Sequence, residues 1–164
     1  MSVVAVRVTD KQIIIAADSI VCRGWSKNTK GDFTKINKDN GMIIGAVGSA
    51  QEASLMWHYM STHKPASSSE KAVLEFIIEF SRWKNDLGAN STVANTYILA
   101  FNGKAFVIES MFVNEIKSYE AIGAGEDYAN AALFLGHSAS EAVKVACELC
   151  CYVAEPIVEY TMDK

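Results

Sequence analysis

The 164-residue sequence has little of several things that mark special classes of protein. It contains 2 prolines and no internal repeat or low-complexity segment. No apolar run approaches the roughly 18 residues that a membrane-spanning helix needs, and Arg7 and Asp10 interrupt the first apolar segment. The length is typical of one domain, so we expect a single domain over residues 1–164, without a signal peptide or membrane anchor.

Positive charge is also scarce. There are 15 Lys and Arg residues against 19 Asp and Glu, which gives a net charge of −4. Nothing forms the basic stripe that replaces the counterions of a phosphate backbone, so we expect no nucleic-acid partner. The hydrophobic content, in contrast, is 50%. This is high for a small domain and predicts that other subunits cover part of its apolar surface.

Cysteine is limited to 4 residues, 3 of which crowd into CELCC at 147–151. Such crowding could indicate a metal site. However, the spacing of i, i+3 and i+4 in a helical stretch without a nearby His is more typical of small buried side chains. We therefore expect no metal and no cofactor. Unpaired thiols also fit the reducing environment of the cytoplasm.

The first half of the chain alternates short β-rich runs with polar turns and then changes period. Strands are predicted over 3–8, 13–17, 33–37 and 42–47, with the polar stretch 22–32 as a connection. Two helices follow, each introduced by Ser with Glu three residues later, the pattern of a capping box. They run from Ser49 to about His63 and from Ser67 to about Asn85.

The second half repeats the order of strands and then helices. A hairpin is predicted over 96–110 with its turn at Asn102–Gly103, followed by extended chain or a strand pair over 111–123. A helix over 126–135 stops at Gly136, and a capping box of Ser138 and Glu141 starts another that runs to about Val153. Residues 156–162 are predicted as a closing strand.

Two β blocks, each followed by a helix pair, predict a four-layer αββα sandwich in the α+β class. Two antiparallel sheets would face one another, and a helix pair would cover each outer face. This arrangement explains why IIIAA and MIIGAV are apolar at every position rather than at alternate ones.

Six stretches carry a resemblance to a known family: VVAVR, IIIAADS, TKIN, GAVGSAQEA, AIGAGEDYANAA and CELCCY. In order and spacing they resemble proteasome β-type subunits and their bacterial HslV-type relatives, which are N-terminal nucleophile hydrolases. In such enzymes a hydroxyl on the first residue attacks a peptide carbonyl, and the α-amino group of that residue takes the proton.

The resemblance assigns roles to three residues besides the nucleophile. Lys35 would lower the basicity of the catalytic amine or hydroxyl, Asp18 would keep that lysine charged and oriented, and the Gly48 N–H would stabilise the oxyanion. Taken singly, Asp18 is also typical of a strand end, Lys35 of a solvated strand and Gly48 of a hinge before a helix. Their joint order within the family pattern favours the catalytic interpretation.

The sequence departs from the family pattern at three places. Aligning VVAVR puts Met1 at the nucleophile position, whereas counting back from AADS puts Ser2 there and requires removal of Met1. Strand alternation favours the first register, because a shift by one residue turns every side chain to the opposite face. Ala124 stands where the family commonly has Ser, and Cys150 stands near the family's second active-site Asp.

Two functions follow from the resemblance. The first is a peptidase with Ser2 as nucleophile. It would assemble into a homo-oligomeric ring of six or seven subunits, as a single ring or as stacked rings, and receive unfolded protein substrates from an ATP-dependent unfoldase in the cytoplasm. The alternative is a catalytically inactive ring or scaffold subunit that retains Met1. A small-amide hydrolase on the same fold is a third, weaker interpretation.

Overall fold

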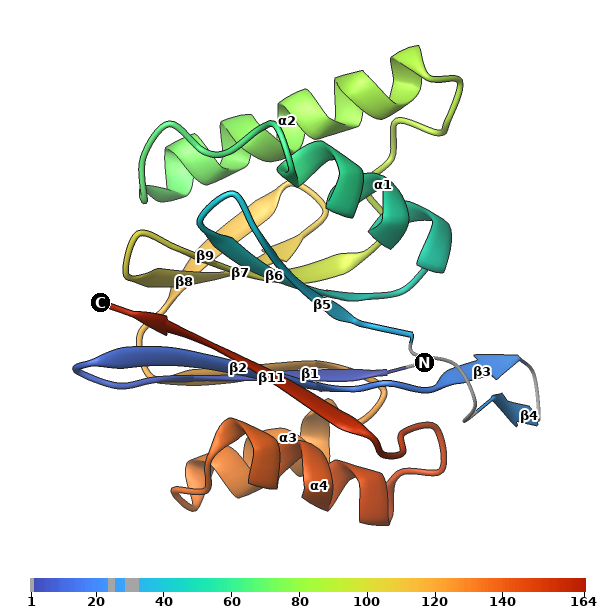
Figure 1. Cartoon of the computed structure of the whole chain (residues 1–164), viewed down its shortest axis with the longest axis vertical. Coiled ribbons are helices and arrows are strands. Elements are labelled where there is room, and N and C mark those ends of the chain that lie inside the picture. Colours follow the sequence, from blue (N-terminus) through green and yellow to red (C-terminus); the bar gives the residue numbers. More distant parts are fainter. Residues whose placement is uncertain (1, 24–25, 29–32) are drawn as a thin grey trace.

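A computed structural model describes residues 2–23, 26–28 and 33–164 of the chain. Within these residues, two antiparallel sheets lie face to face and a pair of helices covers the outer face of each (Figure 1). The predicted αββα sandwich is therefore confirmed. None of the helices in the described part is long and apolar enough to cross a membrane.

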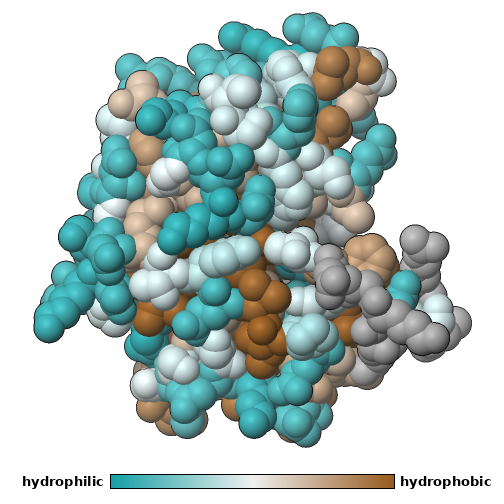
Figure 2. All heavy atoms as spheres, in the orientation of Figure 1, coloured by the Kyte–Doolittle hydropathy of each residue, from teal (hydrophilic) through white to brown (hydrophobic). Residues whose placement is uncertain are grey.

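One sheet contains the first strand in an interior position. Its strand order is β10-β1-β2-β11, and all its pairs are antiparallel. The bounds are β1 Val3–Val8, β2 Gln12–Asp18, β10 Tyr119–Gly123 and β11 Ile157–Asp163. Because β1 has a partner on each side, its main chain is held along both edges. The edge strand β11 lies at the surface, and most of its side chains are half-buried. On the side of the molecule drawn in Figure 2, apolar side chains are exposed where β11 runs.

The other sheet has the order β5-β6-β7-β8-β9. Its strands are β5 Ile36–Asp39, β6 Met42–Val47, β7 Thr96–Phe101, β8 Lys104–Glu109 and β9 Phe112–Ile116. The predicted turn between β7 and β8 is confirmed, since Asn102 and Gly103 both have positive φ, as a two-residue type I′ turn requires. The stretch 111–123 forms two strands that do not pair with each other, because β9 joins β8 and β10 crosses to β1.

Three apolar clusters separate the four layers. Between the sheets lie β-branched side chains such as Val4, Ile15 and Ile43. Aromatic side chains fill the space between the five-stranded sheet and its helices, with Tyr59, Phe76, Phe80 and Tyr97 all buried. Alanine dominates the third cluster, which lets the other helix pair approach the four-stranded sheet closely; its alanines are Ala5, Ala16, Ala121, Ala129, Ala132, Ala139, Ala142 and Ala146.

The helices lie close to where the sequence predicts them. They are α1 Ala50–Met60, α2 Glu70–Asp86, α3 Glu126–Phe134 and α4 Ala139–Leu149. The capping box of Ser138 and Glu141 is confirmed. The capping box predicted from Ser67 is wrong, because Ser69 caps α2 by accepting a hydrogen bond from the Ala72 N–H. Helix α4 ends at Leu149, four residues before the predicted end at Val153, and the next residue, Cys150, has an extended backbone conformation.

A short hairpin interrupts the stretch that the sequence predicts as a plain connection. Strands β3 Val21–Arg23 and β4 Ser26–Asn28 pair as a small separate sheet. Both are only three residues long and carry no apolar alternation, so the sequence offers no periodic signal for them. The following strand, β5, begins at Ile36 rather than at Phe33, which leaves Lys35 immediately before the strand.

Candidate active site

The start of the chain lies against the loop that contains the Gly-Ala-Gly motif. Ser2 is 6% exposed, and its carbonyl oxygen accepts a hydrogen bond from the Gly125 N–H at 3.4 Å. A Cβ atom on Gly123 would come within 2.4 Å of that same oxygen, and φ of Gly123 is +100°. Glycine is therefore required at 123 both by the backbone conformation and by the close approach of Ser2.

Asp18, at the end of β2, joins the first strand to Lys35. One carboxylate oxygen, Oδ1, accepts a hydrogen bond from the Val3 N–H at 2.9 Å, and Oδ2 pairs with the Lys35 Nζ at 2.5 Å. Asp18 is fully buried and Lys35 is 9% exposed. Burial raises the pKa of the Asp18 carboxyl above its ordinary value, while the Lys35 ammonium and the Val3 N–H oppose the rise.

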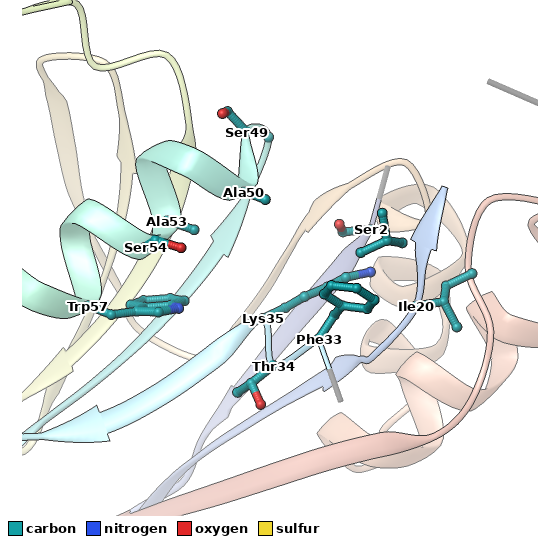
Figure 3. A pocket seen from close by; sticks show the side chains of 12 residues that line it. Ser2, Ile20, Phe33, Thr34, Lys35, Ser49, Ala50, Ala53, Ser54 and Trp57 are labelled. Atoms are coloured by element: carbon teal, nitrogen blue, oxygen red, sulfur yellow. The ribbon is translucent and has the colours of Figure 1, made fainter. Parts of the chain in front are cut away.

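A pocket of about 490 Å³ opens at this end of the sandwich. Ser2, Lys35 and Gly48 all contribute to its lining, so three of the four predicted site residues meet at one cavity. Figure 3 shows Ser2 and Lys35 on one side and side chains of α1 on the other. The walls are largely apolar and include Ile20, Phe33, Ala50, Ala53 and Trp57.

Gly48 forms the turn between β6 and α1. Its φ is +127°, and a Cβ atom there would lie 2.3 Å from Oδ1 of Asn95. The next residue, Ser49, is bound to the same Asn95 side chain twice: its N–H donates to Oδ1 at 2.6 Å and its carbonyl accepts from Nδ2 at 2.9 Å. The turn is thus held from outside helix α1.

The capping box predicted at Ser49 and Glu52 is wrong. Ser49 is the N-cap residue of α1, but its side chain makes no capping hydrogen bond. Glu52 turns inward, where its carboxylate pairs with Lys84 Nζ at 2.7 Å and accepts hydrogen bonds from the Asn95 N–H and the Tyr97 hydroxyl, each at 2.9 Å. These partners lie 32 to 45 residues away in the sequence, so local spacing could not reveal them.

Ala124 and Cys150, the two residues in the second half of the chain that depart from the family pattern, are in contact. Cys150 Sγ donates a hydrogen bond to the Ala124 carbonyl at 3.4 Å, within the loop that holds Ser2. Cys147 is half-buried in α4, and burial raises the pKa of its thiol to about 12. Cys151 is exposed, contrary to the prediction that all three cysteines are buried. No group of three His, Cys, Asp or Glu residues that could hold a metal is found in the described part.

Other candidates from the sequence lie away from the pocket or outside the described residues. The three histidines, His58, His63 and His137, are exposed, and none of them lines the pocket. Met1, Trp25 and most of the polar stretch 22–32 lie outside the residues that the structure describes.

Comparison with known proteins places this fold. No protein-family model matches the sequence, and no curated protein is significantly similar to it. Among solved structures, the BPH of Thiobacillus denitrificans in complex with epoxomicin superposes with a TM-score of 0.88 at 20% identity, over 98% of both chains. A second structure of that BPH gives 0.88 at 19% identity, over 98% of this chain and 97% of the other. The eukaryotic HslV of Trypanosoma brucei gives 0.73 at 17% identity over 99% of both.

The chain has the fold of HslV. The resemblance predicted from the sequence is therefore confirmed at the level of the fold, over nearly the full length of both chains. In this HslV fold, β1 is an interior strand, and Ser2, the residue directly before it, lines the pocket.

Proposed function

We propose that this chain is a peptidase subunit that cleaves peptide bonds with the hydroxyl of Ser2, after Met1 has been removed. The observation that carries the proposal is the convergence of Ser2, Lys35 and Gly48 on one pocket, with Asp18 binding both Lys35 and the residue after Ser2. These are the residues to which the family resemblance assigns catalytic roles. The proposal treats residues 1–164 as one domain of the subunit.

The proposed reaction uses the amine and hydroxyl of Ser2 and the N–H of Gly48 in turn. The freed α-amino group of Ser2, with an ordinary pKa of about 7.7 to 8.0, accepts the hydroxyl proton as Oγ attacks the substrate carbonyl carbon. The carbonyl oxygen becomes an oxyanion beside the Gly48 N–H, and the amine passes the proton to the departing nitrogen. Water then hydrolyses the ester on Ser2 by the same steps, which restores the hydroxyl.

Lys35 and Asp18 tune this base and hold it in place. The Lys35 ammonium disfavours a second positive charge nearby, so it lowers the basicity of the Ser2 amine toward neutral pH. Asp18 compensates the buried charge of Lys35 and fixes the direction of its side chain. Because the Asp18 carboxylate also accepts from the Val3 N–H, it connects the lysine to the strand that carries the nucleophile.

Self-association into a ring is part of the proposal. Phe134 is 76% exposed, Leu135 75% and Leu149 60%, and a shallow apolar pocket lies between α3 and α4 beside them. Large apolar side chains gathered on a surface are typical of protein interfaces. In an HslV-like ring, neighbouring subunits would cover them, and the active sites would face a chamber fed with unfolded protein by a cytoplasmic ATP-dependent unfoldase.

Intact-mass measurement with inhibitor labelling tests the peptidase directly. We expect the purified protein to lack the mass of Met1 and to gain one equivalent of epoxomicin, the compound bound in the Thiobacillus denitrificans BPH structure. Ser2→Ala should abolish labelling and peptidase activity, and Lys35→Ala should reduce the activity by at least about 100-fold. A full-length mass with no labelling, or unchanged activity in both variants, would refute the proposal. Size-exclusion mass tests the ring, which a stable monomer would contradict.

The second candidate is an inactive ring or scaffold subunit that retains Met1. It is favoured by Ala124, which lacks the hydroxyl that the family places near the catalytic amine, and by Cys150, whose thiol binds the Ala124 carbonyl. This candidate predicts an assembled particle with the full-length mass and no reaction with epoxomicin. Intact mass and size exclusion on the same sample distinguish it from the peptidase.

A further inference from the structure

A buried polar network behind the Gly48 turn takes no part in the chemistry described above. Its centre is Glu52, which accepts hydrogen bonds or ion pairs from Lys84, Tyr97, and the N–H groups of Ala94 and Asn95. Lys84 is 2% exposed and also donates to the Thr92 carbonyl at 2.6 Å. The carboxylate therefore organises the whole segment 92–95.

Asn95 is the end of this network that reaches the active site. Its N–H is held by Glu52 at 2.9 Å, and its side-chain amide grips both backbone groups of Ser49. These two hydrogen bonds hold the peptide groups on both sides of the Ser49 Cα, and the first of these groups is the one that joins Ser49 to Gly48. Asn95 is 2% exposed, so water does not compete strongly for these bonds.

The geometry also selects which N–H of the turn can serve an oxyanion. The Ser49 N–H is occupied by Asn95. Along an antiparallel strand, successive N–H groups point to opposite sides, and the Ala46 N–H points toward the β5 side, where it donates to the Lys35 carbonyl. Extending this alternation by two residues, past the end of β6, predicts that the Gly48 N–H faces that same side, and Gly48 itself lines the pocket.

We infer that Asn95, held by Glu52, is a positioning residue that fixes the Gly48 turn so that the Gly48 N–H is aimed at the oxyanion. The inference rests on the proposed function. It deepens that function by adding a residue on a different strand connection, 47 positions from Gly48, that is not among those lining the pocket. A misplacement of about 1 Å at an oxyanion donor typically costs on the order of 100-fold in rate.

Asn95→Ala in the full chain tests the inference. We expect kcat toward a fluorogenic peptide to fall by about 10- to 100-fold, while KM changes by less than about threefold, because the lost contact acts in the transition state. A peptide aldehyde of the same sequence forms a tetrahedral adduct with the nucleophile and so reports on the oxyanion donor. Its inhibition constant should rise in proportion to the loss of kcat/KM.

Ser81→Ala is the matched control. Ser81 is buried on α2 and donates to the Ser91 carbonyl at 2.6 Å, so its removal also costs one hydrogen bond to the segment before β7 without touching Ser49. It should leave kcat and aldehyde affinity close to those of the wild type. An equal loss in Ser81→Ala and Asn95→Ala would overturn the inference, as would a wild-type kcat in Asn95→Ala.

A second variant and a wild-type measurement separate loss of folding, failure of the proposed function and failure of the positioning role. If Asn95→Ala melts below the assay temperature, Asn95→Ser replaces it, since the shorter hydroxyl cannot bind both groups of Ser49 and the same loss of kcat is expected. Wild-type protein without peptidase activity or epoxomicin labelling would refute the proposed function, and with it the role of Asn95. An active wild type with an unaffected Asn95 variant would refute the positioning role alone.

Discussion

The N–H of Val3 donates to Oδ1 of Asp18 at 2.9 Å, so the residue that follows Ser2 is tied to the carboxylate that holds Lys35. The bond links the end of β2 to the start of β1 in the interior of the sandwich. It makes the placement of the proposed nucleophile depend on the same buried charge pair that we propose to tune its amine.

Asp18→Asn should therefore affect stability and activity together. It breaks the buried ion pair of Asp18 with Lys35, and breaking such a pair by removing one partner typically costs about 3–5 kcal/mol in unfolding free energy. We expect denaturant unfolding to show this loss and peptidase activity to fall by at least about 100-fold.

The double variant Asp18→Asn/Lys35→Met provides the control for that prediction. Removing both charges also removes the ammonium that lost the Asp18 carboxylate, so most of the stability should return, while the activity should not. A single variant as stable as the wild type would contradict the importance of the pair, and activity in the double variant would contradict the proposed role of Lys35.

Gly48→Ala should be more harmful than an ordinary glycine substitution at positive φ. Its Cβ would meet Oδ1 of Asn95 at 2.3 Å, in addition to the strain of φ +127°. Gly41→Ala is the matched control, because φ is +77° there and nothing lies within 4 Å of the added atom. We expect about 1–2 kcal/mol of destabilisation and normal activity in the control. Gly48→Ala should lose more folding stability and more peptidase activity than Gly41→Ala, as measured by thermal unfolding and peptide hydrolysis.

Low pH should reduce the free energy of unfolding, in part because it protonates the Glu52 carboxylate. Burial alone would raise the pKa of this carboxyl, but the bonds from Lys84, Asn95, Ala94 and Tyr97 outweigh burial and hold it below its ordinary value of 4.5. A carboxyl with a depressed pKa in the folded state contributes stability above its unfolded pKa, and that contribution is lost as the pH falls through the folded pKa. Unfolding free energy should therefore decline below about pH 4.5.

Comparison with Glu52→Gln/Lys84→Met isolates this contribution. The double variant has no titrating group at 52 and no unpaired ammonium at 84, so its stability should decline less steeply between pH 5 and pH 3, the range in which carboxyls of this kind titrate. Asp18 has a raised pKa and acts in the opposite sense, but it is present in both proteins and cancels in the difference. Parallel acid profiles would contradict the assignment to Glu52.

The apolar pocket predicts the preferred substrates. Ile20, Ala53 and Trp57 form walls that suit an uncharged, bulky side chain next to the cleaved bond. Peptides with Leu or Phe at this position should exceed those with Asp or Glu by at least about 10-fold in kcat/KM.

Ala53→Phe should fill the pocket and reverse the preference toward small side chains. Gln51→Phe, on the exposed face of the same helix and away from the pocket, is the control and should keep the wild-type preference. Equal effects of the two substitutions would refute the assignment of this cavity to substrate binding.

Local signals in the sequence predicted the layers well. The turn at Asn102–Gly103, the capping box at Ser138 and the apolar runs of β1, β2 and β6 each depend on residues close in sequence, and the structure confirms them. The capping box at Ser49 failed because Glu52 has stronger partners in Lys84 and Tyr97, which only the tertiary fold brings near. Asn95, in a polar stretch before β7, gave no sequence signal at all.

Alternation could not settle the position of the nucleophile either. The prediction from strand register favoured Met1 at the nucleophile position, because Val4, Ala5 and Val6 matched the alternation of the family's first strand better in that alignment. In the structure, Val4 and Val6 face the second sheet while Val3 and Ala5 face the helices, and all four are fully buried. When both faces of a strand are apolar, a shift by one residue leaves no trace in the hydrophobic pattern.

The interior position of β1 has a consequence for how the chain matures during synthesis. β1 leaves the ribosome well before β10, which begins at Tyr119 and pairs with one of the two edges of β1. At translation speeds of about 5–20 residues per second, the nascent β1–β2 hairpin keeps unpaired edges for roughly 5–20 s. A hydrophobic hairpin exposed for that time is a target for aggregation or chaperone capture. The four-stranded sheet thus closes around β1 only after the chain up to Gly123 has been made.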